Sequence, residues 1–185
     1  MPRSQRTPFV VLGFLADRPM TGYEIKQEIE SSVAHFWSES YGQIYPVLRR
    51  LAAQKLATAK VERGGIRPRR VFSITSKGRD ALRSWLAGPT EPGVMRQELI
   101  LKLFFGAHGS PNDLVPQVES YRKRAEALLG QLKEAEEEFS GDRASEAKMR
   151  YRLMTVRAGQ QLSQARIKWA HQTLAALAEL SGANS

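Results

Sequence analysis

Residues 41–75 carry the sequence YGQIYPVLRRLAAQKLATAKVERGGIRPRRVFSIT, in which a helical pattern gives way to two alternating ones. Ile44, Leu48 and Leu51 recur at helical spacing, which predicts a helix over about 42–55. Residues 57–63 and 69–75 alternate apolar and polar side chains around a turn rich in glycine and proline, which predicts a β-hairpin. Because Pro46 lacks a backbone N–H, we expect this helix to start near 41–43, with Pro46 in its first turn.

Two helices are predicted before this unit and one after it. Thr7 and Pro8 are typical of a helix start, and a helix over about 8–17 follows, with its apolar stripe at Phe9, Leu12, Leu15 and Ala16. Residues 17–20 are expected to form a turn. Thr21 and Glu24 then have the spacing of a capping box for a helix over about 21–34.

The helix after the hairpin is expected over about 76–87. Thr75 or Ser76 can cap it, and Leu82, Trp85 and Leu86 are expected to face inward. Residues 87–93 contain two prolines and two glycines, so we place the domain boundary there. The predicted organisation is an N-terminal domain over 1–88, a linker over 89–93 and a helical domain over 94–185.

The C-terminal domain is predicted to consist of helices. Residues 95–107 are apolar nearly all round, which favours a buried helix, with a buried strand as the alternative. Ser110 and Pro111 begin a second helix, whose apolar residues alternate at spacings of three and four. This heptad seam consists of Val118, Tyr121, Ala125, Leu128, Leu132, Ala135 and Phe139.

The last helix, over about 144–180, carries two stripes. One runs through Met149, Leu153, Val156, Gln160, Ser163, Ile167, Ala170, Leu174 and Leu177, and the other through Ala158, Leu162, Ala165, Trp169, Thr173, Ala176 and Leu180. The helix over 111–139 can cover one stripe, so the other needs the N-terminal domain or a second chain. We expect a homodimer, with a monomeric helical hairpin as the alternative. The candidate dimerisation residues are Val118, Leu128, Leu132, Leu162, Ile167, Trp169, Leu174 and Leu177.

The charge of the 185-residue chain is concentrated. The formal net charge is +9, and residues 49–83 contain 11 Lys or Arg but only two acids. A bias of this kind favours a polyanionic partner such as nucleic acid. The absence of cysteine excludes disulfides and thiolate metal sites. We expect a cytoplasmic protein with no membrane association, because the apolar run over 9–16 is too short for a span and Asp17-Arg18-Pro19 is unlike a signal-peptide cleavage site.

Three helices followed by a hairpin with a basic turn are typical of a winged helix-turn-helix fold. The third helix would enter the major groove of double-stranded DNA, and the hairpin, or wing, would contact phosphates or the minor groove. The predicted fold class is thus mainly α, with this winged domain and a C-terminal long-helix, coiled-coil-like dimerisation domain. The candidate DNA-binding residues are Tyr23, Ser40, Tyr41, Gln43, Tyr45, Arg49, Arg50, Arg67, Arg69 and Arg70.

The sequence resembles the PadR family of bacterial transcriptional regulators. The resemblance rests on residues 21–25 (TGYEI), 37–51 (WSESYGQIYPVLRRL) and 67–75 (RPRRVFSIT), with weaker similarity over 96–105 and 166–169 to the subgroup that has a long C-terminal domain. It implies a homodimer that binds a palindromic operator, usually a repressor released by a small molecule. It also implies DNA contacts by Tyr41, Gln43, Tyr45, Arg49, Arg67 and Arg69, assisted by Tyr23. The chain departs from the family pattern at Gln54-Lys55-Leu56, where a glycine is common at the exit of the third helix.

Other functions have little support in the sequence. No catalytic or nucleotide-binding fingerprint is present, and the three histidines are isolated, so we expect no enzyme activity, no metal and no cofactor. The alternative to a DNA-binding regulator is a helical interaction protein whose winged domain does not read DNA sequence. The residues that could line a pocket for a small aromatic effector are Trp85, Phe104, Phe105, Tyr121 and Trp169.

Overall fold

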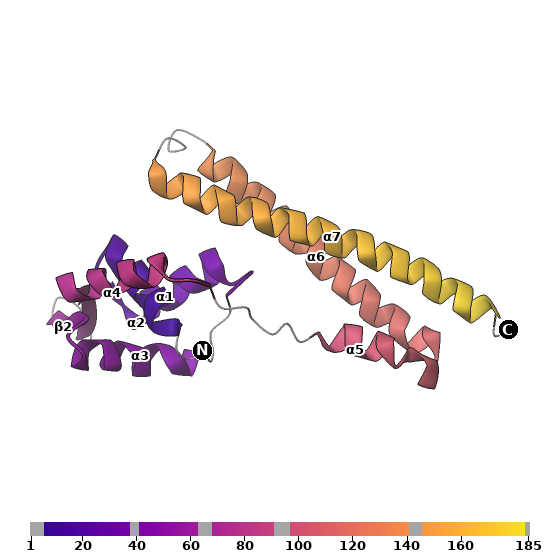
Figure 1. Ribbon diagram of the computed structural model, residues 1–185, viewed down its shortest axis with the longest axis horizontal. Coiled ribbons are helices and arrows are strands. Elements are labelled where there is room, and N and C mark those ends of the chain that lie inside the picture. Colours follow the sequence, from indigo (N-terminus) through magenta and orange to yellow (C-terminus); the bar gives the residue numbers. More distant parts are fainter. Residues whose placement is uncertain (1–5, 38–40, 63–67, 91–96, 141–145, 184–185) are drawn as a thin grey trace. The chain divides into compact units, whose positions relative to one another are not determined.

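The computed structural model describes residues 6–37, 41–62, 68–90, 97–140 and 146–183. It divides into two compact units, residues 1–93 and 94–185, which are drawn in Figure 1. The predicted linker at 89–93 stays a prediction, because residues 91–96 lie outside the described part of the chain.

The first unit contains four α-helices and a small sheet. The elements are α1 (Thr7–Asp17), β1 (Met20–Thr21), α2 (Gly22–Glu28), the π-helical turn η2 (Ile29–Val33), α3 (Tyr41–Ala53), β2 (Ala57–Glu62), β3 (Arg69–Ile74) and α4 (Ser76–Ala87). The strands form an antiparallel sheet in the order β1-β3-β2. The helices and the hairpin predicted from the sequence are confirmed, and the fold is a winged helix-turn-helix.

The core of this unit lies where α1, α2 and α3 meet the sheet. Leu12, Ile25, Leu48 and Leu51 are fully buried, and Phe72 of β3 is 2% exposed. Burying a side chain of this size stabilises a fold by about 1.5–3 kcal/mol. The core therefore fixes which face of α3 points inward and which is left for solvent or a partner.

Four sequence-based expectations near the first two helices are wrong in detail. Residues 20 and 21 form the strand β1 rather than the end of a turn, with Met20 opposite Phe72 and Thr21 opposite Val71. Thr7 is the first residue of α1 and is 1% exposed, so it is not the N-cap, and the buried stripe includes Val11. The second helix ends in a π-helical turn, since its regular part stops at Glu28.

The remaining corrections in this unit concern α3, β2 and α4. Pro46 lies inside α3, beyond the first turn. Val61 is 48% exposed, because β2 buries only Ala57. On α4, Leu82 packs against the core as expected, but Trp85 and Leu86 are 42% and 66% exposed.

The second unit contains α5 (Glu98–Phe104), the 3-10 turn η3 (Gly106–His108), α6 (Pro111–Phe139) and α7 (Ala147–Ala183). The two long helices lie side by side in opposite directions (Figure 1), and Asn112 at the start of α6 accepts a hydrogen bond from Ser181 near the end of α7. The Ser110 side chain caps α6, as the sequence predicts.

The interface between α6 and α7 is a seam with a seven-residue repeat on α7. Its buried members are Val118, Ala125 and Leu132 of α6 and Met149, Val156, Ser163, Ala170 and Leu177 of α7. This confirms the first of the two predicted stripes. Towards the α6–α7 turn the seam becomes polar: Gln160 donates to the Leu132 carbonyl at 3.2 Å and to Glu136 at 2.8 Å.

The expectation that α5 is a buried helix is wrong. Leu99 and Leu103 pack against the cluster around Leu114, but no described residue of α5 is fully buried. The other large apolar side chains are exposed, by 57% for Leu101 and 79% for Phe104. Five of the seven residues of α5 are apolar and they lie on more than one side of the helix, so the sequence pattern resembles that of a core helix although only one side is covered in a single chain.

Glycine is required at position 78, so we expect Gly78→Ala to destabilise the first unit by about 2 kcal/mol or more. A Cβ there would lie 2.1 Å from the Leu56 carbonyl oxygen, which is a backbone atom and cannot rotate away. Gly13→Ala is the control, since nothing lies within 4 Å of a Cβ at that position of α1. Gly13→Ala should raise the free energy of unfolding, measured in urea, by about 0.5–1 kcal/mol. Equal effects of the two substitutions would contradict the requirement for glycine at position 78.

Lys55→Gly should stabilise the protein by about 0.5–1 kcal/mol, because Lys55 has a positive φ of 59°. The N–H of Leu56 donates to the Leu51 carbonyl at 2.9 Å and that of Lys55 to the Ala52 carbonyl at 3.0 Å, the pattern of a Schellman motif. The lysine thus occupies the position at which glycine is the usual residue of this motif. Gln54→Gly, one residue earlier, should not increase stability. A loss of stability in Lys55→Gly would show that the positive φ of Lys55 is not the cause.

Candidate nucleic-acid interface

The helix α3 presents one buried and one exposed face. Ile44, Val47, Leu48 and Leu51 are at most 4% exposed. On the other face Tyr45 is 53% exposed, and Arg49 and Arg50 are exposed. An exposed helix face with an aromatic and two arginine side chains offers hydrogen-bond donors to base edges and phosphates.

Close packing between α2 and α3 positions Tyr45. A Cβ on Gly22 would lie 2.8 Å from the Tyr45 ring and 3.2 Å from the Leu48 side chain, so only glycine allows this approach. The next residue, Tyr23, is 57% exposed, and its hydroxyl accepts a hydrogen bond from Gln27 at 3.1 Å. The structure therefore brings Tyr23 and Tyr45 to the same end of α2.

The first residues of the wing strand β3 reach the same region. Thr21 is the last residue of β1 and lies opposite Val71, so the chain enters α2 beside the part of β3 that contains Arg69 and Arg70. Both arginines are exposed. The register of the sheet thus brings the basic end of the wing next to the start of α2.

The described arginines of this surface form no ion pairs, although Glu62 of β2 lies opposite Arg69 of β3 in the sheet. Within the described residues, none of Arg49, Arg50, Arg69 and Arg70 makes an ion pair. Counterions gather near such charges in water, and a bound phosphate backbone would release them.

Some candidates cannot be placed. Ser40 and Arg67 lie outside the described residues, and Tyr41 and Gln43 belong to α3 without described side chains. Two basic residues that the sequence reasoning missed lie nearby: Lys26, whose ammonium group is 5.8 Å from the centre of the Tyr23 ring, and Lys60, exposed on β2. The spacing of Tyr23 and Lys26, one helical turn apart, was the available signal for the first of these.

The five candidate effector-pocket residues are not gathered in one place within either unit. Trp85 stacks on Phe9 of its own unit, with ring centroids 5.0 Å apart. In the second unit, Phe104 contacts Phe105 and Tyr121 contacts Trp169, the latter edge to face at 5.4 Å. A groove in this unit lies between α5 and α6 and is lined by other residues.

The candidate dimerisation residues fall into two groups. Val118, Leu132 and Leu177 are at most 5% exposed within one chain, because they form the seam between α6 and α7. Leu162 is 58% exposed, while Leu128, Ile167, Trp169 and Leu174 are half-buried. Of the second predicted stripe of α7, Trp169 and Thr173 are half-buried, and the other members are exposed: Ala158, Leu162, Ala165, Ala176 and Leu180.

The described ranges contain neither a cluster of metal-binding side chains nor a membrane-spanning helix. Within them, no three His, Asp or Glu side chains are placed to hold a metal ion. None of the helices described there is long and apolar enough to cross a membrane.

These features define a winged helix-turn-helix protein with an added domain of long helices. Comparison with known proteins agrees: residues 11–84 match the PadR-like family of transcriptional regulators, and residues 95–178 match the C-terminal domain called virulence activator alpha. The chain belongs to the PadR-like family, a class of transcriptional regulators and not of enzymes.

Individual relatives match both units. The chain is 30% identical to the virulence activator AphA of Vibrio cholerae over 94% of its length and 98% of that structure, with a TM-score of 0.75. It is 26% identical to the probable transcriptional regulator Rv1176c of Mycobacterium tuberculosis, covering 93% of this chain and 97% of that one. Bacillus subtilis PadR, solved with operator DNA, has the same fold, with a TM-score of 0.78 at 21% identity, covering 92% and 98%.

The capping box of α2 makes the stability of the first unit depend on pH. The Thr21 backbone N–H, 2.7 Å from the Glu24 carboxylate, and the Thr21 hydroxyl at 2.8 Å lower the pKa of Glu24, and Arg18 adds a weaker attraction. A carboxyl whose pKa is lowered in the folded state contributes stability above its unfolded pKa and loses it as the pH falls through the folded pKa.

We therefore expect Glu24→Gln to cost about 0.5 kcal/mol at pH 7, since the amide can still cap α2 but cannot hold the charge. The difference from the parent should vanish in urea unfolding at pH values below the folded pKa of Glu24. Glu134→Gln, at an exposed position of α6 in the other unit, is the control and should leave the stability of the first unit unchanged. A stability difference between the parent and Glu24→Gln that persists at low pH would show that the charge of Glu24 is not its cause.

Proposed function

We propose that this protein is a homodimeric, sequence-specific DNA-binding repressor that acts in the cytoplasm and is released from a palindromic operator by a small molecule. The observation that carries the proposal is the surface formed by α3, the start of α2 and the start of β3. It exposes two tyrosines and four arginines that have no ion-pair partner among the described residues.

In the proposed complex, α3 lies in the major groove. Arg49 and Arg50 contact guanine edges or phosphates, and Tyr45, supported by Gly22, contacts the sugar–phosphate backbone or a thymine methyl group. Arg69 and Arg70 of the wing contact phosphates beside the same half-site. The Bacillus subtilis relative solved with operator DNA supports this use of the fold.

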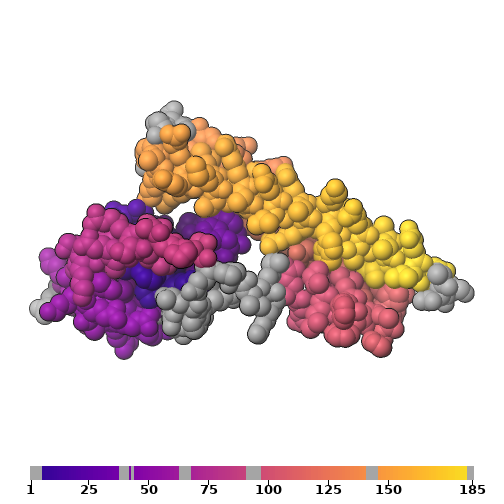
Figure 2. Space-filling view, in the orientation of Figure 1, coloured from indigo at the N-terminus to yellow at the C-terminus, as the bar shows by residue number. Residues whose placement is uncertain are grey.

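The exposed stripe of α7 supports the dimer. Tyr151, Met154 and Leu162 are 71%, 63% and 58% exposed, and they recur at helical spacing together with Ala158 and Ala165. In Figure 2 the side chains of α7, orange to yellow, form a continuous surface on the visible face. Apolar stripes of this length are typical of interfaces between chains, and a two-fold dimer would present two winged units to two half-sites about 34 Å apart, or a multiple of that.

Release by a small molecule follows if the ligand binds the DNA-free arrangement more tightly than the DNA-bound one. Bacillus subtilis PadR has been solved with p-coumaric acid, which supports a ligand-controlled regulator for this fold. That relative is described as a negative transcriptional regulator, which supports repression.

The DNA proposal is tested by fluorescence anisotropy at about 150 mM salt, with the region upstream of the protein's own coding sequence and a scrambled duplex. We expect a preference of at least about 10³-fold for the native region. The double variant Arg49→Ala/Arg69→Ala should bind at least about tenfold more weakly and show a shallower salt dependence. Arg150→Ala, an exposed arginine on α7, is the matched control, and equal loss in both variants would disprove the assigned surface.

The dimer proposal is tested by analytical ultracentrifugation. The parent should sediment with twice the chain mass of 20.8 kDa. Leu162→Glu places a charge in the exposed stripe and should raise the dimer dissociation constant at least about tenfold. Gln164→Glu, at an exposed position three, four or seven residues from no member of the stripe, should leave the mass unchanged. A parent that stays monomeric at all concentrations would refute the dimer.

A further inference from the structure

The exposed side of α2 carries a hydrogen-bonded pair, Tyr23 and Gln27, one helical turn apart. The side-chain N–H group of Gln27 donates to the Tyr23 hydroxyl at 3.1 Å. Tyr23 is 57% exposed and Gln27 is also exposed, so both side chains are open to a partner from solvent. A hydrogen bond at such a position adds little stability, because water can replace either partner. The pair is thus placed to contact a partner rather than to hold the helix together.

The direction of this hydrogen bond determines what Tyr23 can offer. An amide N–H group can only donate, so the phenolic oxygen is the acceptor, and within the described residues the Tyr23 O–H has no acceptor of its own. A hydroxyl that accepts one hydrogen bond donates a second one more strongly, because the two bonds polarise each other. Gln27 also restricts the rotamers of Tyr23, so less side-chain entropy is lost on binding. Tyr23 is therefore a pre-oriented donor for an acceptor such as a phosphate oxygen.

Among the described residues, no acidic side chain bonds to the Tyr23 hydroxyl. The capping box occupies Glu24, and Glu28 is paired with an arginine 3.1 Å away. The Lys26 ammonium group lies 5.8 Å from the centre of the Tyr23 ring and adds positive charge beside it. Glu30 comes four residues after Lys26 and offsets part of that charge, so the hydroxyl is the more specific donor to an anion.

Tyr23 lies at the point where α2 meets the other two DNA-facing elements. Gly22, the residue before it, approaches the Tyr45 ring of α3 so closely that a Cβ would lie 2.8 Å away. Thr21 pairs with Val71 of the wing strand. In helix-turn-helix proteins the second helix of the motif enters the major groove, while the first crosses the sugar–phosphate backbone. Hydroxyl groups on that first helix are suited to phosphate oxygens, a contact that positions the protein without reading sequence.

We propose that Gln27 is a positioning residue for DNA binding: it orients the Tyr23 hydroxyl, which donates a hydrogen bond to a phosphate oxygen. This inference rests on the proposed function. Gln27 acts through Tyr23 and needs no contact with DNA itself. Because the acceptor is a phosphate, the contact contributes equally to the operator and to a duplex of unrelated sequence.

The test is a double-mutant cycle, measured by fluorescence anisotropy of the full chain with the upstream duplex and the scrambled one. Tyr23→Phe should raise the dissociation constant of both duplexes at least about tenfold, the usual loss for a hydrogen bond to a charged group. Gln27→Met keeps the length of the side chain without its amide and should raise both dissociation constants about threefold or more. In the Tyr23→Phe background, Gln27→Met should have no further effect.

Gln27→Glu tests the direction of the hydrogen bond. A carboxylate can only accept, so it would take the Tyr23 proton away from the phosphate, and its charge would repel the DNA backbone. We expect weaker binding than in Gln27→Met, and a smaller loss when Gln27→Glu is introduced into the Tyr23→Phe background. The salt dependence of binding should be unchanged in Tyr23→Phe and Gln27→Met, since neither removes a charge.

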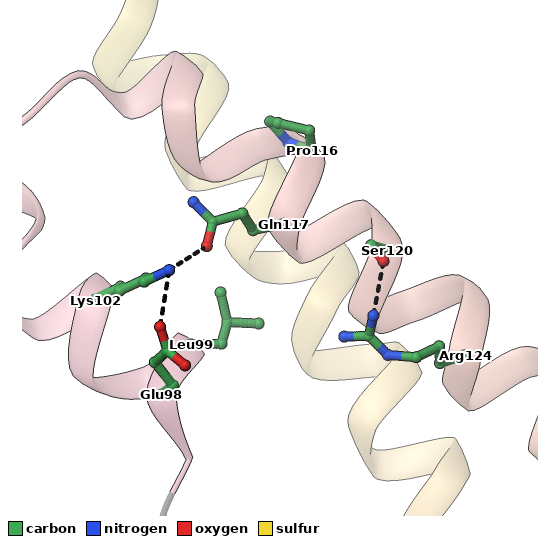
Figure 3. Close-up of a pocket in the computed structure, with 7 residues that line it drawn as sticks. All are labelled: Glu98, Leu99, Lys102, Pro116, Gln117, Ser120 and Arg124. Carbon is green, nitrogen blue, oxygen red and sulfur yellow. Dashed lines mark hydrogen bonds and ion pairs between the residues drawn. The ribbon is translucent and has the colours of Figure 1, made fainter.

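The matched control is Gln117→Met on α6, which removes a glutamine that accepts a hydrogen bond from Lys102 at 3.3 Å (Figure 3). It should leave both dissociation constants unchanged. Urea unfolding checks that the Tyr23 and Gln27 variants are as stable as the parent, as their exposed positions lead us to expect.

Unchanged binding in Gln27→Met, or an equal loss with and without the Tyr23 hydroxyl, would overturn the positioning role. A preference for the upstream duplex together with either of these results refutes the positioning role alone. Equal binding of both duplexes with the expected cycle refutes sequence-specific recognition alone. A parent that binds neither duplex refutes both.

Discussion

Thr21 joins the sheet to the helices of the DNA-facing unit. As the last residue of β1 it pairs with Val71 of the wing strand, and as the N-cap of α2 it exchanges hydrogen bonds with Glu24. One residue later, Gly22 permits the approach of Tyr45 from α3. The relative placement of wing, α2 and α3 thus depends on two consecutive residues, Thr21 and Gly22. A shift in this junction would separate the tyrosines from the arginines of β3.

The second unit is organised by a different constraint, the repeat along α7. Small residues at Ser163 and Ala170 let the helices approach closely, while Met149, Val156 and Leu177 supply apolar contact. At the turn end, Glu136 accepts hydrogen bonds from Arg157 at 2.7 Å and from Gln160 at 2.8 Å, which lower its pKa. Such polar contacts add little stability at an exposed site, but they fix the register of two helices whose apolar residues alone would allow slippage.

Much of this architecture could be predicted because it follows from local rules. The capping box at Thr21, the start of α6 at Ser110 and the heptad spacing each rest on residues close in sequence. The strand β1 could not be predicted, since two residues carry no periodicity and gain their pairing only from β3, 50 residues later in the chain. The exposure of α5 was missed for a related reason: an apolar segment shows that a helix needs partners, not whether its own chain supplies them. At the site, Arg49, Arg50, Arg69 and Arg70 could be found from charge alone, whereas the role of Gly22 beneath Tyr45 needed the tertiary contact.

Ser163 has a consequence for how the long hairpin opens. Its side chain is fully buried at the midpoint of the five seam positions of α7, and within the described residues its hydroxyl has no hydrogen-bond partner. A buried hydroxyl without a partner lowers the local stability of the layer that contains it. We therefore expect the hairpin to unfold as two segments, an apolar one around Val118 and Leu177 and a polar one around Glu136 and Gln160, with a weaker layer between them. Amide hydrogens near the centre of α7 would exchange with solvent through local fluctuations that leave both flanking segments protected, so the longest helix of the protein would behave as two foldons.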